Sequence, residues 1–141
     1  MEYTTLGRTG LKVSVAGLGC GGAAKLGLGY GHNEQHAMGI VQRALDCGVN
    51  FIDTAQYYGT EPAVGAAIAG RSRDSLVIST KHKVSLVDGT VYSAAEILAG
   101  LDRSLRALKT DYVDVFCLHT VRPHEYERVS REILPVLLRE K

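Results

Sequence analysis

Short apolar runs alternate with amphipathic stretches along most of the chain. The apolar runs, which are typical of buried strands, are residues 13–18, 49–53, 76–81 and 112–119. The stretches with apolar residues at helical spacing are residues 33–47, 62–69, 93–108 and 125–141. Buried strands that alternate with helices pair in parallel through right-handed crossovers. The pattern therefore predicts an α/β fold with a parallel sheet.

Residues at the helix ends support these assignments. Asn33 suits the N-cap of the first helix, and Gly48 suits its C-terminal end. Pro62 suits the first turn of the second helix, where its missing N–H does no harm. Ser93 and Glu96 have the spacing of a capping box at the start of the third helix.

Two further segments lie before the first helix. Residues 3–6 and 11–13 are strand-like and flank the turn Gly7-Arg8-Thr9-Gly10, which predicts an N-terminal β-hairpin. Residues 23–32 are rich in glycine, so we expect a loop without helix that lines a site.

Two architectures fit this order of elements. One is an arc of a β/α barrel, and the other is a small doubly wound sheet. A barrel arc keeps all its helices on one face of the sheet, whereas a doubly wound sheet carries helices on both faces. In a barrel arc, Cys117 would point inward with His119, because residues two apart on a strand share a face.

Composition narrows the class of protein. The chain has 141 residues, 45% hydrophobic and 22% charged, with a formal net charge of +1. This balance argues against nucleic acid or a membrane surface as a partner, and no apolar run is long enough to span a bilayer. The three cysteines are far apart and form no CxxC pattern, which argues against a disulfide framework or a metal site. We expect reduced thiols in a cytoplasmic protein.

Titratable residues end three of the predicted strands, namely Asp53, Lys81 and His119, and Tyr58 follows in the loop after Asp53. Parallel strands share one C-terminal edge, which is the catalytic face of a β/α barrel. Taken singly, each residue has a simpler explanation: a helix cap, a solvated strand end, a core histidine or a packing aromatic. Because all four residues are expected at one edge of the sheet, a functional site is favoured over these separate explanations.

Proton delivery to a carbonyl is the chemistry that these four residues suit. A phenol titrates near pH ~10, and the Lys81 ammonium would stabilise the Tyr58 phenolate while Asp53 held Lys81 in place. His119 would orient the carbonyl oxygen, and Tyr58 would be the general acid. None of these side chains supplies a hydride, so a redox reaction requires a nicotinamide cofactor.

The segment 48–65, with Asp53-Thr54-Ala55-x-x-Tyr58-Gly59 and Glu61-x-x-Val64-Gly65, resembles the signature of the aldo-keto reductase family. The resemblance extends to residues 6–14, to Ser79-Thr80-Lys81 and to residues 104–119, and so covers nearly the whole chain. It implies a (β/α)8 barrel, NADP(H) or less often NAD(H), and a catalytic tetrad of Asp53, Tyr58, Lys81 and His119.

The resemblance also implies a partial barrel. A full barrel takes about 250 residues, so residues 1–141 would form a single incomplete domain: the N-terminal half of a TIM barrel, four of eight β/α units, with the N-terminal β-hairpin. The family's second half carries most of the cofactor site. The expected cofactor contacts here are Asp53 and the backbone at Gly21 and Gly22. No helix follows these glycines directly, so they are not a Rossmann fingerprint.

The predicted function is NAD(P)H-dependent reduction of aldehydes and ketones, with the 141-residue chain truncated and weakly active or inactive alone. One alternative is a nucleotide-sensing subunit that resembles potassium-channel beta subunits. Another is a small non-catalytic α/β binding domain. Unpaired strand edges would favour self-association in either barrel interpretation.

Overall fold

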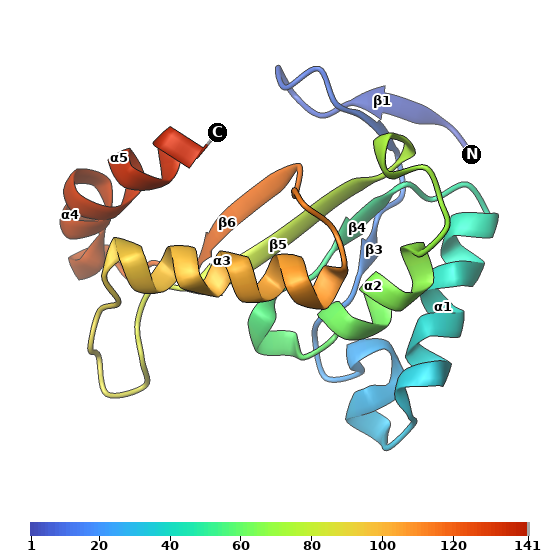
Figure 1. The fold of residues 1–141 in the computed structure, drawn as a ribbon, viewed down its shortest axis with the longest axis horizontal. Coiled ribbons are helices and arrows are strands. Elements are labelled where there is room, and N and C mark those ends of the chain that lie inside the picture. Colours follow the sequence, from blue (N-terminus) through green and yellow to red (C-terminus); the bar gives the residue numbers. More distant parts are fainter. Residues whose placement is uncertain (141) are drawn as a thin grey trace.

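A parallel sheet of four strands in the order β3-β4-β5-β6 forms the centre of the computed structural model, which describes residues 1–140 (Figure 1). The strands are β3 (Leu18–Gly19), β4 (Phe51–Asp53), β5 (Val77–Lys83) and β6 (Val115–His119). Each pairs in parallel with the strand that follows it in the chain. Sequential parallel pairing is the arrangement found in a β/α barrel.

The predicted N-terminal hairpin is present as β1 (Tyr3–Thr5) paired antiparallel with β2 (Lys12–Ser14). It is attached at the N-terminal end of β4, where the Tyr3 hydroxyl donates a hydrogen bond to the Gly48 carbonyl at 2.9 Å. The Asn50 amide donates to the Lys12 carbonyl, also at 2.9 Å. The hairpin therefore lies away from the C-terminal edge of the sheet.

Helices follow the strands as predicted. The longer ones are α1 (Glu34–Asp46), α2 (Glu61–Ile68) and α3 (Ala94–Leu108). The C-terminal segment contains α4 (Tyr126–Arg128), a π-helical stretch (Val129–Ile133) and α5 (Leu134–Leu137). Short 3-10 helices are η1 (Lys25–Tyr30), η2 (Gln56–Tyr58), η3 (Arg73–Ser75), η4 (Pro123–Glu125) and η6 (Leu138–Glu140). Asn33 caps α1, and Ser93 with Glu96 forms a capping box on α3, as predicted.

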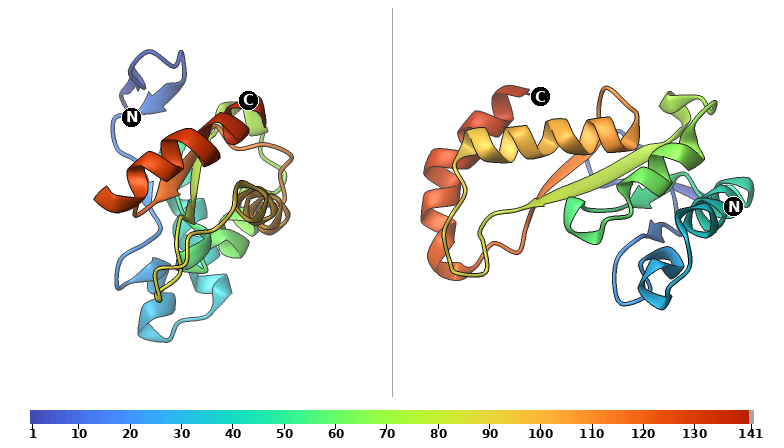
Figure 2. Two further views of the ribbon diagram at one scale, coloured as in Figure 1. Left: turned by 90° about the vertical axis from the view of Figure 1, so that its left-hand side faces the viewer. Right: turned by 60° about the horizontal axis from the view of Figure 1, so that its bottom comes forward.

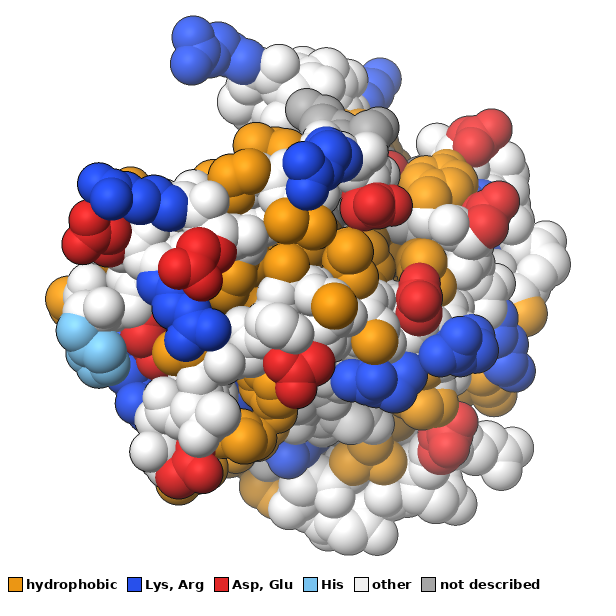
Figure 3. Space-filling view, turned by 60° about the vertical axis from the view of Figure 1, so that its left-hand side comes forward, with side chains coloured by type: hydrophobic (Ala, Val, Ile, Leu, Met, Phe, Trp, Pro, Cys, Tyr) orange, Lys and Arg blue, Asp and Glu red, His pale blue; other side chains and the backbone are white. Residues whose placement is uncertain are grey.

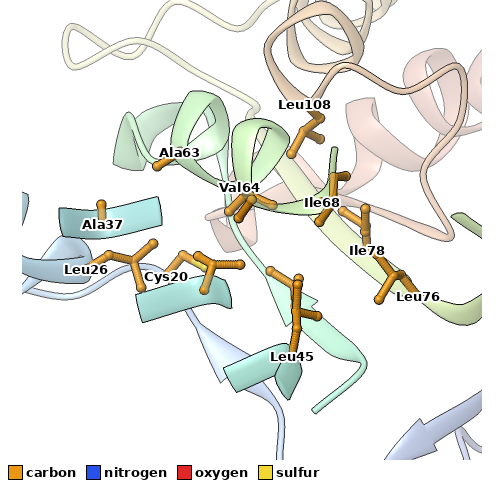
Figure 4. Close-up of a cluster of buried hydrophobic side chains, with 13 residues drawn as sticks. Cys20, Leu26, Ala37, Leu45, Ala63, Val64, Ile68, Leu76, Ile78 and Leu108 are labelled. Atoms are coloured by element: carbon orange, nitrogen blue, oxygen red, sulfur yellow. The ribbon is translucent and has the colours of Figure 1, made fainter. Parts of the chain in front are cut away.

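The helices cover one face of the sheet. Ile52 and Ile78 are register partners, and both are buried in the main core cluster with Leu45 of α1 and Val64 of α2. Figure 4 shows Ile78, Leu45 and Val64 in this cluster. Helices α1, α2 and α3 lie side by side in chain order (Figure 1).

Helical segments also cover this face at the β6 end of the sheet. Phe116 and Leu118 of β6 pack in a second cluster with Ile97 of α3 and Ile133 of the C-terminal segment, and α5 contacts α3 (Figure 2). The opposite face carries Lys81 and its register partner Cys117. The structure is therefore a barrel arc, and the doubly wound alternative is wrong.

All four predicted strands of the sheet have different bounds. β4 begins at Phe51 and β6 at Val115, a few residues later than predicted, and the other two differ more in kind. The run 13–18 is divided between the hairpin and β3, because Ser14 bonds to Asn50 and its hydroxyl donates to the Ala16 carbonyl at 2.7 Å, which turns the chain. β5 continues beyond Lys81 because Lys83 pairs with His119 on β6. Lys81 is therefore inside its strand, not at its end.

The glycine-rich segment 23–32 also differs from its prediction. It contains the 3-10 helix η1, and Leu26 is buried in the main core cluster beside Ala37 (Figure 4). Leu26 and Gly27 have φ values of 57° and 91°, which break the helix between its two turns. The segment thus packs into the core.

Two surface features bear on possible partners. β3 and β6 are the edge strands of the sheet, and Phe51, Val115 and Cys117 on its inner face are only partly buried. Hydrophobic side chains gather across the middle of the face shown in Figure 3. None of the helices within residues 1–140 has the length and apolar character needed to cross a membrane.

Candidate active site

An ion pair joins the central strands at their C-terminal ends. Asp53 ends β4 and is the register partner of Ser79, so Lys81, two residues further along β5, lies on the same face as the carboxylate. The Lys81 Nζ atom lies 2.6 Å from Asp53 Oδ2 and 2.8 Å from the Thr54 carbonyl oxygen, and donates to both. The Lys81 side chain is only 16% exposed, so these two acceptors fix its ammonium.

Tyr58 and His119 lie next to this pair. Tyr58 belongs to η2, directly after β4, and its ring centroid is 5.3 Å from Lys81 Nζ. The His119 ring stands nearly perpendicular to the Tyr58 ring, at 89°, with 5.6 Å between the centroids. The structure therefore brings together all four residues that the sequence placed at one edge.

The environment of His119 disfavours the protonated form of its ring. Burial lowers the pKa of His119, the ammonium groups of Lys81 and Lys83 lower it further, and Asp53 opposes them. Its Nδ1 atom is buried and has no hydrogen-bond partner within residues 1–140. An imidazole that donates from Nε2 and leaves Nδ1 without a proton fits this arrangement.

Gly21 borders Tyr58. A Cβ atom at residue 21 would lie 2.7 Å from Cε2 and Cζ of the Tyr58 ring, so any side chain there would displace the phenol. The Cys20 amide donates to the Asp53 carbonyl at 2.8 Å, which holds this loop against β4. Gly21 thus makes room for Tyr58, a role that sequence reasoning missed because a glycine gives no signal for a distant partner.

Cys20 is close to the ion pair but is not a nucleophile. Burial raises the pKa of its thiol to about 12, with a further rise from the Asp53 charge that Lys81 partly offsets. A thiol that keeps its proton at neutral pH is unreactive. Cys20 instead packs in the main core cluster beside Leu26 (Figure 4).

Buried polar pairs behind the sheet support the loop that carries Tyr58. The Thr80 hydroxyl donates to Glu61 Oε1 at 2.6 Å, and the hydroxyls of Thr54 and Thr60 are 2.9 Å apart. One pair joins the first residue of α2 to β5, and the other joins the N-cap residue of α2 to the residue that follows β4. They fix the distance between η2 and β5.

Lys83 is a residue near the site that the sequence prediction missed. It is the register partner of His119, and its Nζ atom lies 3.4 Å from the centroid of the Tyr57 ring. The alternation of side chains along a strand would have placed it on the face of Lys81. The predicted strand ended at Lys81, so the pattern was not followed to residue 83.

The tetrad lies on an open face of the arc. A surface hollow lined by Arg73, Leu76 and Lys109 lies near the N-terminal end of β5, away from Tyr58 and His119. Asp53, Tyr58, Lys81 and His119 instead occupy the edge where a β/α barrel has its functional groups. Fold and site together define this chain as an arc of a β/α barrel with a polar cluster at the C-terminal edge of its strands.

Comparison with known proteins identifies the family. Residues 18–138 match the sequence model of the Aldo/keto reductase family, and the chain belongs to that family. It is 33% identical to L-galactose dehydrogenase of Arabidopsis thaliana, over 97% of this chain and 44% of that protein. It is 37% identical to a putative voltage-gated potassium channel subunit beta of Schizosaccharomyces pombe, over 87% of this chain and 38% of that protein.

Solved structures show the same fold. A thermostable aldo-keto reductase in complex with the inhibitor epalrestat matches with a TM-score of 0.79 at 30% identity, over 99% of this chain and 49% of that one. The holo form of an aldo-keto reductase from Bacillus halodurans matches with a TM-score of 0.79 at 31% identity, over 99% of this chain and 46% of that one. The predicted family and barrel fold are confirmed, and the chain spans half or less of the length of these relatives.

Proposed function

We propose that the protein reduces aldehydes or ketones to alcohols with NADPH or NADH, and that this chain supplies the proton-transfer part of the site. The observation that carries the proposal is the position of Lys81, whose ammonium is fixed by Asp53 at 2.6 Å and lies 5.3 Å from the centroid of the Tyr58 ring. The relatives named above include a dehydrogenase, and L-glyceraldehyde 3-phosphate reductase of Escherichia coli is 31% identical over 86% of this chain and 37% of that protein.

Each side chain has one role in this proposal. His119 donates a hydrogen bond from Nε2 to the carbonyl oxygen and orients it. Tyr58 gives its hydroxyl proton to that oxygen as the carbonyl carbon is reduced, and the phenolate later recovers a proton from water. The Lys81 ammonium stabilises the phenolate, while Asp53 keeps Lys81 in place.

A bound nicotinamide supplies the hydride, which none of these side chains can supply. The residues that would contact it here are Asp53 and the backbone of Gly21 and Gly22. The absence of a Cβ at Gly21 lets this backbone lie directly against the Tyr58 ring. We also propose the cytoplasm as the compartment, because the cysteine pattern suits reduced thiols.

A fusion tests the proposal. We would join residues 1–141 to the second half of the Bacillus halodurans relative and measure aldehyde-dependent oxidation of NADPH, beside the 141-residue chain alone. The fusion should be active and lose about 10²- to 10⁴-fold in kcat on Tyr58→Phe, whereas the chain alone should have little activity. Tyr126→Phe is the matched control, since Tyr126 is 68% exposed on α4. A fusion whose activity is indifferent to Tyr58→Phe would overturn the proposal.

A nucleotide sensor is the second candidate, favoured by the 37% identity to the potassium channel subunit beta. A sensor can retain the tetrad, so the residues alone do not separate the two functions. Tight NADPH binding by the fusion without turnover of any aldehyde, together with a membrane protein that co-purifies, would favour the sensor over the reductase.

A further inference from the structure

Lys83 is a second cation on the inner face of the sheet, beside the tetrad. It is the register partner of His119, as Lys81 is of Cys117, so both lysines follow the same alternation on β5. The Lys81 charge is matched by Asp53. Within residues 1–140, no carboxylate lies within ion-pair distance of Lys83.

An aromatic ring holds this cation without neutralising it. Lys83 Nζ lies 3.4 Å from the centroid of the Tyr57 ring, which attracts the ammonium through its π electrons. Tyr57 is 62% exposed, so the ring that contacts this ammonium lies at the protein surface. Its charge also reaches the reaction centre, because it helps to lower the pKa of His119.

We propose that Lys83 selects carbonyl substrates that carry a carboxylate or phosphate group close to the reacting carbonyl. This inference rests on the proposed function, because it assumes that His119 and Tyr58 hold the carbonyl oxygen. Lys83 and His119 are register partners on adjacent strands, whose backbones lie about 4.8 Å apart, so an anionic group at Lys83 would belong to the same small substrate as a carbonyl at His119. Short oxo acids and phosphorylated short aldehydes carry an anionic group within a few bonds of the carbonyl carbon.

Matched pairs of substrates test the selection in the fused barrel. Glyoxylate and glycolaldehyde form one pair, and glyceraldehyde 3-phosphate and glyceraldehyde form the other. Lys83→Met should raise KM about tenfold or more for the anionic member, since it removes a hydrogen bond to a charged group, and should change KM for the neutral member far less. Lys83→Arg should retain the preference.

The control is Lys12→Met, which removes the other lysine that lies over a tyrosine, here Tyr3 at 5.5 Å in the hairpin. It should change neither KM. Equal effects of Lys83→Met on the neutral and anionic substrates would overturn the inference. A rise only in the KM for NADPH would also overturn it, because the cation would then bind a cofactor phosphate.

A binding measurement in the 141-residue chain separates this inference from the proposed function. Inorganic phosphate should shift the NMR signals of the His119 ring in a saturable way, and Lys83→Met should abolish the shift. If the fusion has no reductase activity but the Lys83-dependent shift is present, the proposed reaction fails while anion binding by Lys83 is supported. A phosphate shift that persists in Lys83→Met, or is missing from the unmodified chain, overturns the inference.

Discussion

Lys81 Nζ lies 2.6 Å from Asp53 Oδ2, in an ion pair between adjacent parallel strands. The Asp53 side chain is 40% exposed, so water screens the attraction and the pair contributes only about 0 to 1 kcal/mol to the free energy of unfolding. Its consequence is positional: the ammonium is held beside the ring of Tyr58. Stability and activity should therefore respond differently when the pair is broken.

Asp53→Asn tests that separation. The amide keeps the size of the side chain but removes its charge, so the ammonium loses its fixed partner. We expect kcat of the fused barrel to fall about 10²-fold or more, while the free energy of unfolding changes by less than about 1 kcal/mol. Kinetics with an aldehyde and urea denaturation measure the two effects. A loss of stability as large as the loss of activity would contradict this prediction.

Gly21→Ala should displace Tyr58. The added Cβ would meet the phenol ring at 2.7 Å, so the ring must move away from Lys81 and His119. We expect a loss of kcat with an intact fold, followed by circular dichroism. Gly19→Ala is the matched control, because a Cβ at residue 19 meets nothing within 4 Å. Equal activity of the two variants would show that the position of the Tyr58 ring does not depend on Gly21.

The strands were predictable because each contains a short apolar run, and the parallel order brought Asp53, Lys81 and His119, at the predicted ends of three of them, to one edge. What the pattern could not show is where small residues are buried. In α3, Gly100 and Ser104 are buried together with the apolar Ile97 and Leu108. A Cβ at Gly100 would overlap the His82 ring, so this close contact requires a glycine on the buried face of α3. A hydrophobic pattern does not indicate such a position, because glycine has no side chain.

The sequence pattern also did not predict the register of β5 on β6. The length of a strand depends on how far its partner runs, and β6 pairs as far as His119, which extends β5 to Lys83. Only the pairing shows that Lys83 belongs to the same face as Lys81. The conformation of the glycine-rich segment 23–32 also depends on a contact distant in sequence, since Leu26 is buried in the main core cluster with a left-handed φ of 57°.

His119 should make stability depend on pH. Its pKa is lowered in the folded protein by burial and by Lys81 and Lys83, against the pull of Asp53. As pH falls through the unfolded value of 6.5, the unfolded chain takes up a proton that the folded chain does not, so the free energy of unfolding decreases until the pH falls below the folded pKa. His119→Gln should reduce this decrease in urea denaturation between about pH 7.5 and about pH 5.

Part of the decrease in the free energy of unfolding on acidification should remain in His119→Gln. Burial also lowers the pKa of His82, with a smaller contribution from Arg103, so this residue destabilises the fold in the same direction on acidification. His82→Gln therefore serves as the comparison, because it is the same substitution made on the opposite face of the sheet. An unchanged slope in His119→Gln would mean that His119 titrates alike in the folded and unfolded chains.

The 141-residue chain should associate with a second copy of itself. Its edge strands β3 and β6 leave backbone groups for pairing, and Phe51, Val115 and Cys117 leave the inner face partly apolar. We expect sedimentation to show a dimer that Val115→Lys weakens. Val87→Lys is the matched control, since Val87 is 93% exposed in a loop. A monomer at all concentrations would refute this prediction.

Arg73 and Asp114 should be the ion pair that contributes most to stability. Their side chains are 17% and 10% exposed, with 2.6 Å between Arg73 Nη2 and Asp114 Oδ2. The same Asp114 oxygen accepts the Ile78 amide at 2.8 Å, and Arg73 also donates to the Leu76 and Tyr112 carbonyls. The pair therefore joins the start of β5 to the segment before β6.

Asp114→Ala would leave the Arg73 guanidinium and the Ile78 amide without their acceptor in a mostly buried place. We expect the free energy of unfolding to fall by about 3 kcal/mol, measured by urea denaturation. Asp46→Ala removes a second Arg–Asp pair of equal 2.6 Å length, Arg71 with Asp46, whose side chains are 36% and 55% exposed. Because water screens that pair, its loss should cost less than about 1 kcal/mol. Similar losses in both variants would show that burial does not set the strength of these pairs.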